Sequence, residues 1–73
     1  MKNTEVSNEI KAAFLANQKV TLMEKGNPYD VWELVKTPRT VRWRKFYTGE
    51  KGTVKDLSEF FECTDDLAIL RIE

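Results

Sequence analysis

Residues 40–48 constrain the fold of this chain more than any other stretch. Their sequence, T-V-R-W-R-K-F-Y-T, joins three aromatic side chains to three cations in a pattern that favours a β-strand. Because successive strand residues point to opposite faces, one face carries Val41, Trp43, Lys45 and Tyr47. The other face carries Arg42, Arg44, Phe46 and Thr48. The apolar residues change sides near positions 45 and 46, which predicts a bulge or a pronounced twist there.

Such a strand needs neighbouring strands and a covering layer, and the chain has 73 residues to supply them. A chain of this size folds as one domain that buries only ~60% of its unfolded surface. Its hydrophobic content of 41% is enough for one sheet with helices packed on it. We therefore expect a single domain over residues 1–73, with residues 1–6 frayed.

Two segments have the 3.6-residue spacing of helices that bury one face. The first helix is predicted from about Asn8 to Ala16, with Ser7 as its N-cap. The second is predicted after a turn at residues 49–52, with Thr53 as its N-cap and its end near Glu62. The apolar face of this second helix carries Val54, Leu57, Phe60 and Phe61.

Three more segments read as strands or turns. Residues 19–24 and 29–35 are predicted to form a hairpin, because residues 25–28 contain the turn formers glycine, asparagine and proline. Residues 67–72 form an apolar run interrupted only by Arg71, which predicts a strand in the centre of the sheet. The expected fold is α+β, in the order α-β-β-β-α-β, with a mostly antiparallel four-stranded sheet packed by helices.

Catalytic, metal and cofactor sites find little support in the composition. The chain has no histidine, and Cys63 is its only cysteine, so an internal disulfide is excluded and the usual zinc ligands are missing. No serine or cysteine lies beside an evident base, and there is no glycine-rich phosphate loop. No apolar stretch approaches the ~20 residues of a membrane-spanning helix. We expect a non-enzymatic cytoplasmic protein without a metal or cofactor.

The formal net charge is zero, with 12 cations and 12 acids, but the charges are segregated along the chain. Residues 36–55 hold seven cations and one acid, a net charge of +6, and residues 56–73 hold one cation and six acids, a net charge of −5. Such a protein can meet an acidic partner with one face and a basic partner with another. The alternative is that the two segments neutralise each other across the sheet.

The basic and aromatic residues of the 40–48 strand form one candidate binding surface. Bases of single-stranded nucleic acid stack on aromatic rings while cations meet the phosphates. The alternative is that the aromatic residues belong to the core and the cations cover their edges, and the overall neutrality also argues against a dedicated nucleic-acid binder. The candidate residues are Arg42, Trp43, Arg44, Lys45 and Phe46.

The second predicted helix and the turn after it form an acidic candidate surface. Carboxylates spaced along an exposed helix face can imitate the phosphates of DNA and occupy the DNA-binding groove of another protein. The alternative is an ordinary solvated helix face with acids near its N-terminus. The acidic residues are Asp56, Glu59, Glu62, Asp65 and Asp66.

The same region resembles a known family. Residues 56–62, D-L-S-E-F-F-E, and residues 64–73, T-D-D-L-A-I-L-R-I-E, resemble the helix and last strand of the small bacteriophage inhibitors of uracil-DNA glycosylase. The resemblance implies a dimeric, non-enzymatic DNA mimic that holds an apolar side chain of the glycosylase in a hydrophobic pocket. It places Leu57 and Phe61 among the pocket residues. The implied partner-binding set is Asp56, Leu57, Glu59, Phe61, Glu62, Asp65 and Asp66.

Three hypotheses of function follow. The first is a phage-encoded protein that inhibits a host DNA-processing enzyme, with uracil-DNA glycosylase as the specific partner that the resemblance names. The second is a single-stranded nucleic-acid-binding protein that uses the 40–48 strand. The third is a structural or assembly adaptor, whose strand pairs with a second copy of the chain to form a homodimer. None of them involves a membrane.

Overall fold

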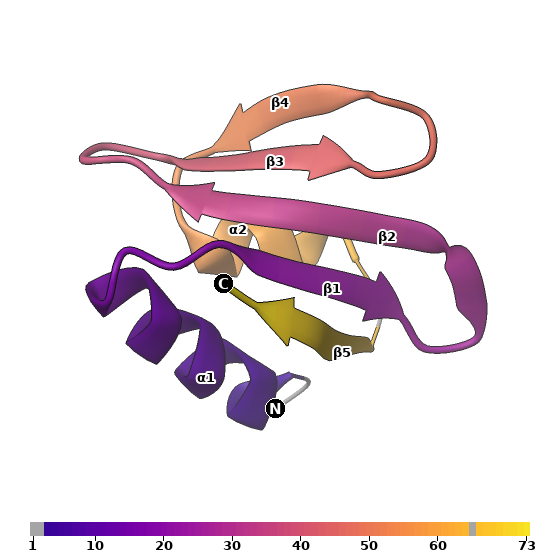
Figure 1. The fold of residues 1–73 in the computed structure, drawn as a ribbon, viewed down its shortest axis with the longest axis horizontal. Helices are drawn as coiled ribbons and strands as arrows, with labels where there is room; N and C mark the ends of the chain where they lie inside the picture. Colours follow the sequence, from indigo (N-terminus) through magenta and orange to yellow (C-terminus); the bar gives the residue numbers. More distant parts are fainter. Residues whose placement is uncertain (1–2, 65) are drawn as a thin grey trace.

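Strand β2, Asn27–Lys36, is the middle strand of a five-stranded antiparallel sheet with the order β4-β3-β2-β1-β5 (Figure 1). We describe this fold from a computed structural model, which covers residues 3–64 and 66–73. The other strands are β1, Val20–Glu24; β3, Val41–Lys45; β4, Lys51–Val54; and β5, Leu67–Ile72. The helices are α1, Thr4–Leu15, and α2, Leu57–Glu62. The predicted α+β class with an antiparallel sheet is confirmed, and the full order is α-β-β-β-β-α-β.

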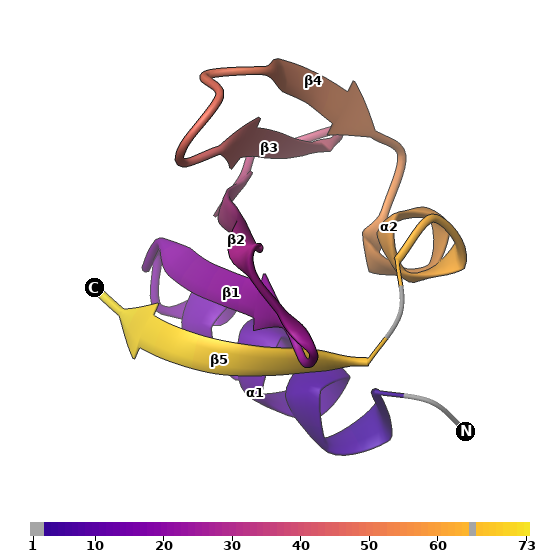
Figure 2. The ribbon, with the colours of Figure 1, turned by 90° about the vertical axis from the view of Figure 1, so that its right-hand side faces the viewer.

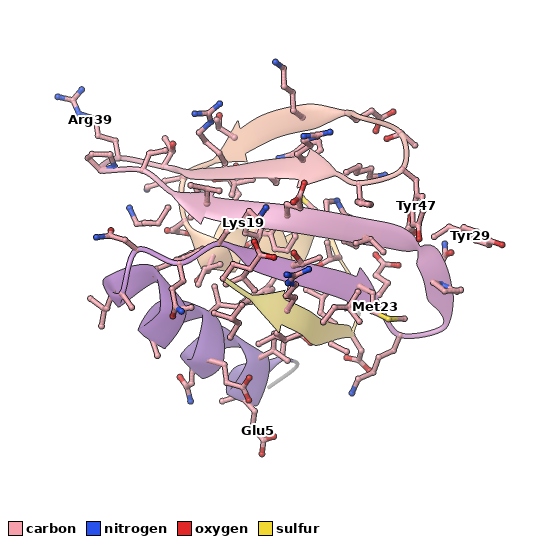
Figure 3. All side chains as sticks on the ribbon, in the orientation of Figure 1. Glu5, Lys19, Met23, Tyr29, Arg39 and Tyr47 are labelled. Atoms are coloured by element: carbon pink, nitrogen blue, oxygen red, sulfur yellow. The ribbon has the colours of Figure 1, made fainter. Side chains whose placement is uncertain are left out.

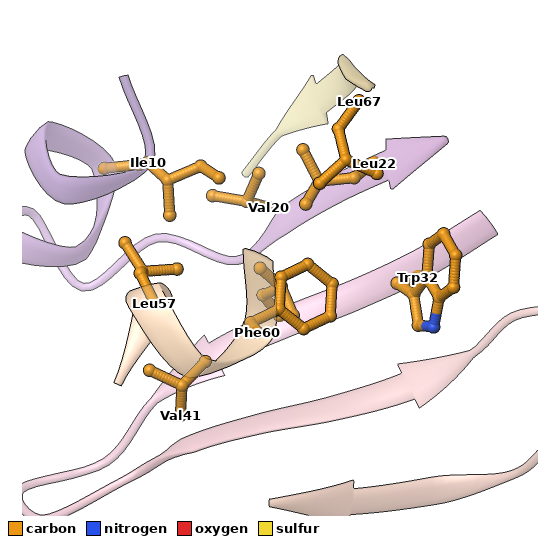
Figure 4. Packing of buried hydrophobic residues seen from close by; sticks show 10 residues of the cluster. Ile10, Val20, Leu22, Trp32, Val41, Leu57, Phe60 and Leu67 are labelled. Atoms are coloured by element: carbon orange, nitrogen blue, oxygen red, sulfur yellow. The ribbon is translucent and has the colours of Figure 1, made fainter. Parts of the chain in front are cut away.

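The register of the strands sends the large apolar side chains to one face of the sheet. Leu34 on β2 lies opposite Val20 on β1 and Trp43 on β3, so these three residues share that face. Both helices pack there and contribute to one cluster, in which the rings of Trp32 and Phe60 meet edge to face at 5.9 Å (Figure 4). The buried cluster contains Ile10, Ala13, Val20, Leu22, Trp32, Leu34, Val41, Leu57, Phe60 and Leu67.

Helix α1 begins four residues earlier than the Ser7 cap predicts. Asn3 adopts a left-handed conformation with φ 64° at the N-cap position, and its Oδ1 accepts a hydrogen bond from the Leu67 N–H at 2.9 Å. That bond ties the start of α1 to the start of β5, so a tertiary contact sets the helix boundary. Ser7 is therefore an interior helix residue and does not cap the helix.

Residues of β4 were predicted to form part of a turn, at 49–52, and the N-cap of the second helix, at Thr53. Gly52 lies opposite Trp43, and Thr53 lies opposite Arg42, so both pair with β3. Helix α2 starts later, at an N-cap formed by Asp56, whose side chain accepts a hydrogen bond from the Glu59 N–H at 3.0 Å. The Thr53 cap is wrong because strand pairing with β3 holds that residue in an extended conformation.

Strand β5 lies at the edge of the sheet and not at its centre. Its neighbour in the sheet is β1. Thr21 lies opposite Arg71 and Leu22 lies opposite Ile69, so the register of this pairing shifts by one residue, as in a β-bulge. Leu67 is buried, whereas Leu70 is 53% exposed. A continuous apolar run predicts burial on both faces, but at an edge much of that apolar surface stays in contact with solvent.

The sheet is strongly bent, and this bend decides where α2 lies. Figure 2 shows β4 and β5 at opposite ends of the curved sheet, with α2 beside the hollow between them. Strand β3 ends at Lys45 and a turn follows, so the predicted irregularity near positions 45 and 46 is the end of the strand. The helices cover the inner face, and within the described residues no helix covers the other face, called here the open face.

The contact between Gly52 and Trp43 predicts a specific loss of stability in Gly52→Ala. A Cβ atom at position 52 would lie 2.8 Å from Cζ2 of the Trp43 indole, so the ring must shift. We expect a loss of about 1–3 kcal/mol in the free energy of unfolding, measured by urea denaturation. In a Trp43→Val background the same change should cost little, because the ring is gone. An equal loss in both backgrounds would contradict this account.

Candidate nucleic-acid interface

Strand β3 divides the predicted basic-aromatic set between the two faces of the sheet. Arg42 and Arg44 lie on the open face and are exposed. Trp43 and Lys45 lie on the helix-covered face, where Trp43 packs against the core and the Lys45 ammonium lies 5.6 Å from the centre of the Trp32 ring. Alternation along β3 thus directs the side chains of Trp43 and Lys45 away from the face that carries the two arginines.

Phe46 directly follows the last residue of β3. Its N–H donates a hydrogen bond to the carbonyl oxygen of Val31 at 2.8 Å, which extends the β2–β3 ladder one residue beyond β3. Phe46 itself lies in the turn after β3, and 52% of the residue is exposed. The two guanidinium groups thus lie on the open face of β3, and an exposed aromatic ring follows just beyond the end of the strand.

Strand β4 adds a second row beside the first. Lys51 lies opposite Arg44, and Thr53 lies opposite Arg42. A groove of ≈ 630 Å³ runs over this part of the sheet. Its lining residues are Lys19, Glu33, Val35, Arg42, Trp43, Arg44, Lys51, Gly52 and Thr53.

The acids near the open face pair with other cations. Glu33 lies 2.9 Å from the Lys19 ammonium and Glu73 lies 3.9 Å from it, and Glu73 also pairs with Arg71. The hydrogen bond and charge of Glu33 raise the pKa of Lys19, so this lysine stays charged and offsets the one acid that lines the groove.

The other three cations of the groove have no such ion pair in the described ranges. Within residues 3–64 and 66–73, neither Arg42, Arg44 nor Lys51 forms an ion pair. Arg44 has Lys51 opposite it on β4 and Glu33 opposite it on β2. The pair of like charges is destabilising, and an anionic ligand would relieve its repulsion.

A cluster of three exposed aromatic rings lies at one end of the sheet. The ring centroids of Phe46 and Tyr47 are 5.1 Å apart, and those of Tyr47 and Tyr29 are 6.0 Å apart. Both pairs have an edge-to-face arrangement. Tyr29, near the start of β2, and Tyr47, in the turn after β3, project together at one end of the sheet, and Arg39 projects at the opposite end (Figure 3). We call Tyr29, Phe46 and Tyr47 the aromatic cluster.

The acidic candidate set is dispersed by the fold. The carboxylate of Asp56 caps α2, and Oε2 of Glu59 accepts a hydrogen bond from the Lys55 N–H at 2.7 Å, so both act within the local backbone. Leu57 is only 7% exposed. The others differ in exposure: Phe61 is half-buried, Glu62 and Asp66 are exposed, and Asp65 lies outside the described residues.

A second hollow lies between the two helices. It has a volume of ≈ 440 Å³, and its walls are mainly apolar. Leu15, at the end of α1, is 89% exposed beside it. The lining residues are Lys11, Phe14, Leu15, Lys36, Val41, Asp56, Leu57 and Ser58.

Sequence reasoning missed Lys51, Tyr29 and Tyr47 as members of the open-face surface and the aromatic cluster. Lys51 fell in a predicted turn, although its alternation with Thr53 was a signal for a strand. Tyr29 and Tyr47 are 18 residues apart, and only the pairing of β2 with β3 brings their segments together. Pairing of this kind has no signal in the local sequence.

Comparisons with known proteins add no family. No protein-family model matches the chain, no curated protein matches it significantly, and no solved structure matches it significantly. The resemblance to the glycosylase inhibitors therefore stays a prediction. Across residues 3–64 and 66–73, no group of three or more histidine, cysteine or acidic residues is arranged to hold a metal ion. Within the same ranges, no helix is long and apolar enough to cross a membrane.

The capping role of Asp56 predicts different effects for two acids of the α2 region. Asp56→Ala should lower the free energy of unfolding by about 1 kcal/mol, because the Glu59 N–H loses its acceptor. Glu62→Ala makes the same change in charge at an exposed position near the C-terminal end of α2. It should leave stability unchanged or slightly higher, since an acid is unfavourable there. Chemical denaturation of both variants tests this, and equal losses would be inconsistent with it.

Proposed function

We propose that this protein binds single-stranded nucleic acid on its open face, in the cytoplasm. The observation that supports it is the pair of exposed arginines on β3, Arg42 and Arg44, with exposed Phe46 in the turn that follows, Lys51 beside Arg44, and no ion pair to any of the three cations in the described ranges. Cations and an exposed aromatic ring are the two components that a bound single strand requires.

The cations account for affinity in this proposal. Each phosphate neutralised by an arginine or lysine releases condensed counterions, so binding weakens as salt rises, with a slope of about −0.7 per phosphate for single strands. Three cations give an expected slope of roughly −2. The guanidinium groups also offer paired N–H donors to phosphate oxygens, which the lysine does not.

Phe46 accounts for the preference for a single strand. An aromatic ring stacks on the face of a base only when that base is free of its neighbours, and each such contact contributes ~1–3 kcal/mol. In a duplex the base faces are already stacked on one another. Among the described residues, neither α1 nor α2 lies on the open face, where a helix could enter a groove of double-stranded DNA. An unpaired strand therefore uses both components, and a duplex uses only the cations.

The inhibitor hypothesis is a second candidate, and the hollow between the helices favours it. Leu57 lines that hollow with Leu15 and Phe14, and Asp56 is also among the lining residues. A hydrophobic recess beside acidic groups is what the predicted inhibitor would offer to a protruding apolar side chain of a DNA-processing enzyme. Glu62 and Asp66 provide further exposed carboxylates in the same region of the chain.

Removal of one cation from the open face should weaken the binding of a single strand. Arg44→Gln is expected to lower the affinity for a fluorescein-labelled dT12 severalfold and to reduce the steepness of its salt dependence by about 0.7. Fluorescence anisotropy over a salt series measures both. Lys11→Gln, which removes the same charge from α1 on the other side of the sheet, is the matched control and should change neither value. The proposal fails if dT12 does not bind, or if both variants lose affinity equally.

The second candidate predicts inhibition in a uracil-excision assay. The protein should reduce excision by a bacterial uracil-DNA glycosylase, and Leu15→Asp should abolish the effect, because it puts a charge at the mouth of the apolar hollow. Val35→Asp, an exposed apolar residue of the open face, serves as the control. No inhibition at a large molar excess would remove the glycosylase version of this candidate.

A further inference from the structure

The hollow between the two helices combines an apolar lining with two lysines. Val41 and Leu57, two of its lining residues, are buried members of the hydrophobic core (Figure 4). Its volume of ≈ 440 Å³ lies toward the lower end of the ~300–1,000 Å³ that small-molecule sites occupy. The hollow is therefore large enough for a small ligand, and its lining indicates a ligand that is mainly apolar.

Lys11 and Lys36 reach this hollow from two different elements. On α1, Lys11 shares a face with Phe14 and Leu15, because residues three and four positions apart lie on the same side of a helix. Lys36 lies opposite Val41 in the pairing of β2 with β3, so its side chain leaves the sheet on the helix-covered face. Both lysines thus line the hollow together with apolar side chains.

These two lysines are available to an anion. Neither Lys11 nor Lys36 forms an ion pair in the part of the chain that the structure describes. The Lys36 ammonium donates a hydrogen bond to the carbonyl oxygen of Thr37, and an ammonium has two further N–H groups to offer. Among the described lining residues Asp56 is the one acid, and its carboxylate accepts the Glu59 N–H. The charges of the lining therefore favour an anionic group over a cation.

The apolar lining favours an aliphatic chain over a peptide. Each peptide residue carries a backbone N–H and C=O, and burying these groups without partners costs free energy. Apart from its charged groups, the described lining offers one side-chain hydroxyl, that of Ser58. An aliphatic chain needs no hydrogen bond, and it would cover Leu15, which is 89% exposed.

We propose that this hollow binds a medium-chain fatty acid. Its aliphatic chain lies against Phe14, Leu15 and Leu57, and its carboxylate pairs with the ammonium groups of Lys11 and Lys36. The site is separate from the open face, so it does not depend on the nucleic-acid proposal. It also differs from the recess of the inhibitor candidate, because an apolar side chain in that recess would need no cation.

Isothermal titration calorimetry with three eight-carbon ligands tests this site. Octanoate, octan-1-ol and octylammonium share the apolar chain and differ in the charge of the head group. At concentrations below micelle formation, octanoate should bind at least about fivefold more tightly than octan-1-ol, because charge-assisted hydrogen bonds to lysine are the stronger ones. Octylammonium should bind most weakly, and hexanoate should bind about fivefold to tenfold more weakly than octanoate. Equal affinities for octanoate and octan-1-ol, or no binding of either, would overturn the proposal.

Variants at exposed positions locate the site without disturbing the core. Lys11→Gln and Lys36→Gln should each weaken octanoate severalfold and leave octan-1-ol unchanged, and a loss in only one of them assigns the carboxylate to that lysine. Leu15→Asp should weaken both ligands, because it adds a negative charge beside the apolar lining.

Arg44→Gln is the matched control, since it removes the same charge from the open face. It should leave octanoate binding unchanged while it weakens dT12, and Lys11→Gln should do the reverse. An octanoate affinity that neither lysine variant lowers, or that Arg44→Gln lowers equally, would overturn the fatty-acid site. The nucleic-acid proposal would then still stand, because its ligand and its charge variant are different.

Discussion

The register of β3 against β2 is the constraint on which the rest of the structure depends. Leu34 is fully buried at the centre of the sheet, and Trp43 must lie opposite it to close the core. Because strand side chains alternate, that single pairing also places Arg42 and Arg44 on the open face. A slip of one residue would bury both guanidinium groups and expose the indole. The same apolar contacts that stabilise the fold therefore determine the position of the candidate interface.

Alternation within a segment was predictable, and pairing between segments was not. The two faces of residues 41–45 follow from the sequence, because the apolar residues Val41 and Trp43 alternate with the cations Arg42 and Arg44. Strand β4 was missed because its first residues resemble a glycine turn, and only the Trp43 ring lying against Gly52 explains the small residue. The edge position of β5 was missed because an apolar run has no period that distinguishes a central strand from an edge. The start of α1 depends on the Asn3–Leu67 hydrogen bond, which joins residues far apart in the sequence.

The candidate site was predictable to the same extent. Arg42, Arg44 and Phe46 were identified from their spacing on one predicted strand, and the shared face of the two arginines is the part that alternation determines. Trp43 and Lys45 were included in the same set because they are aromatic and basic. In the structure both lie on the helix-covered face, where the Trp43 indole packs against the core. Lys51 and the two tyrosines come from other segments, so their place in the interface depends on the topology β2-β3-β4.

Formal neutrality is a poor guide to the charge that this protein presents to a ligand. Of the acids that lower the total, Asp56 and Glu59 accept backbone hydrogen bonds at the start of α2. Glu33 and Glu73 pair with Lys19, and Glu50 lies 3.8 Å from the Lys45 ammonium. Each of these carboxylates is held beside a local partner, so its field at β3 and β4 is reduced by the adjacent donor or cation and by solvent. Arg42, Arg44 and Lys51 form no ion pair in the described ranges, although Glu33 lies opposite Arg44. The local potential therefore depends on where the charges lie and not on their sum over the chain.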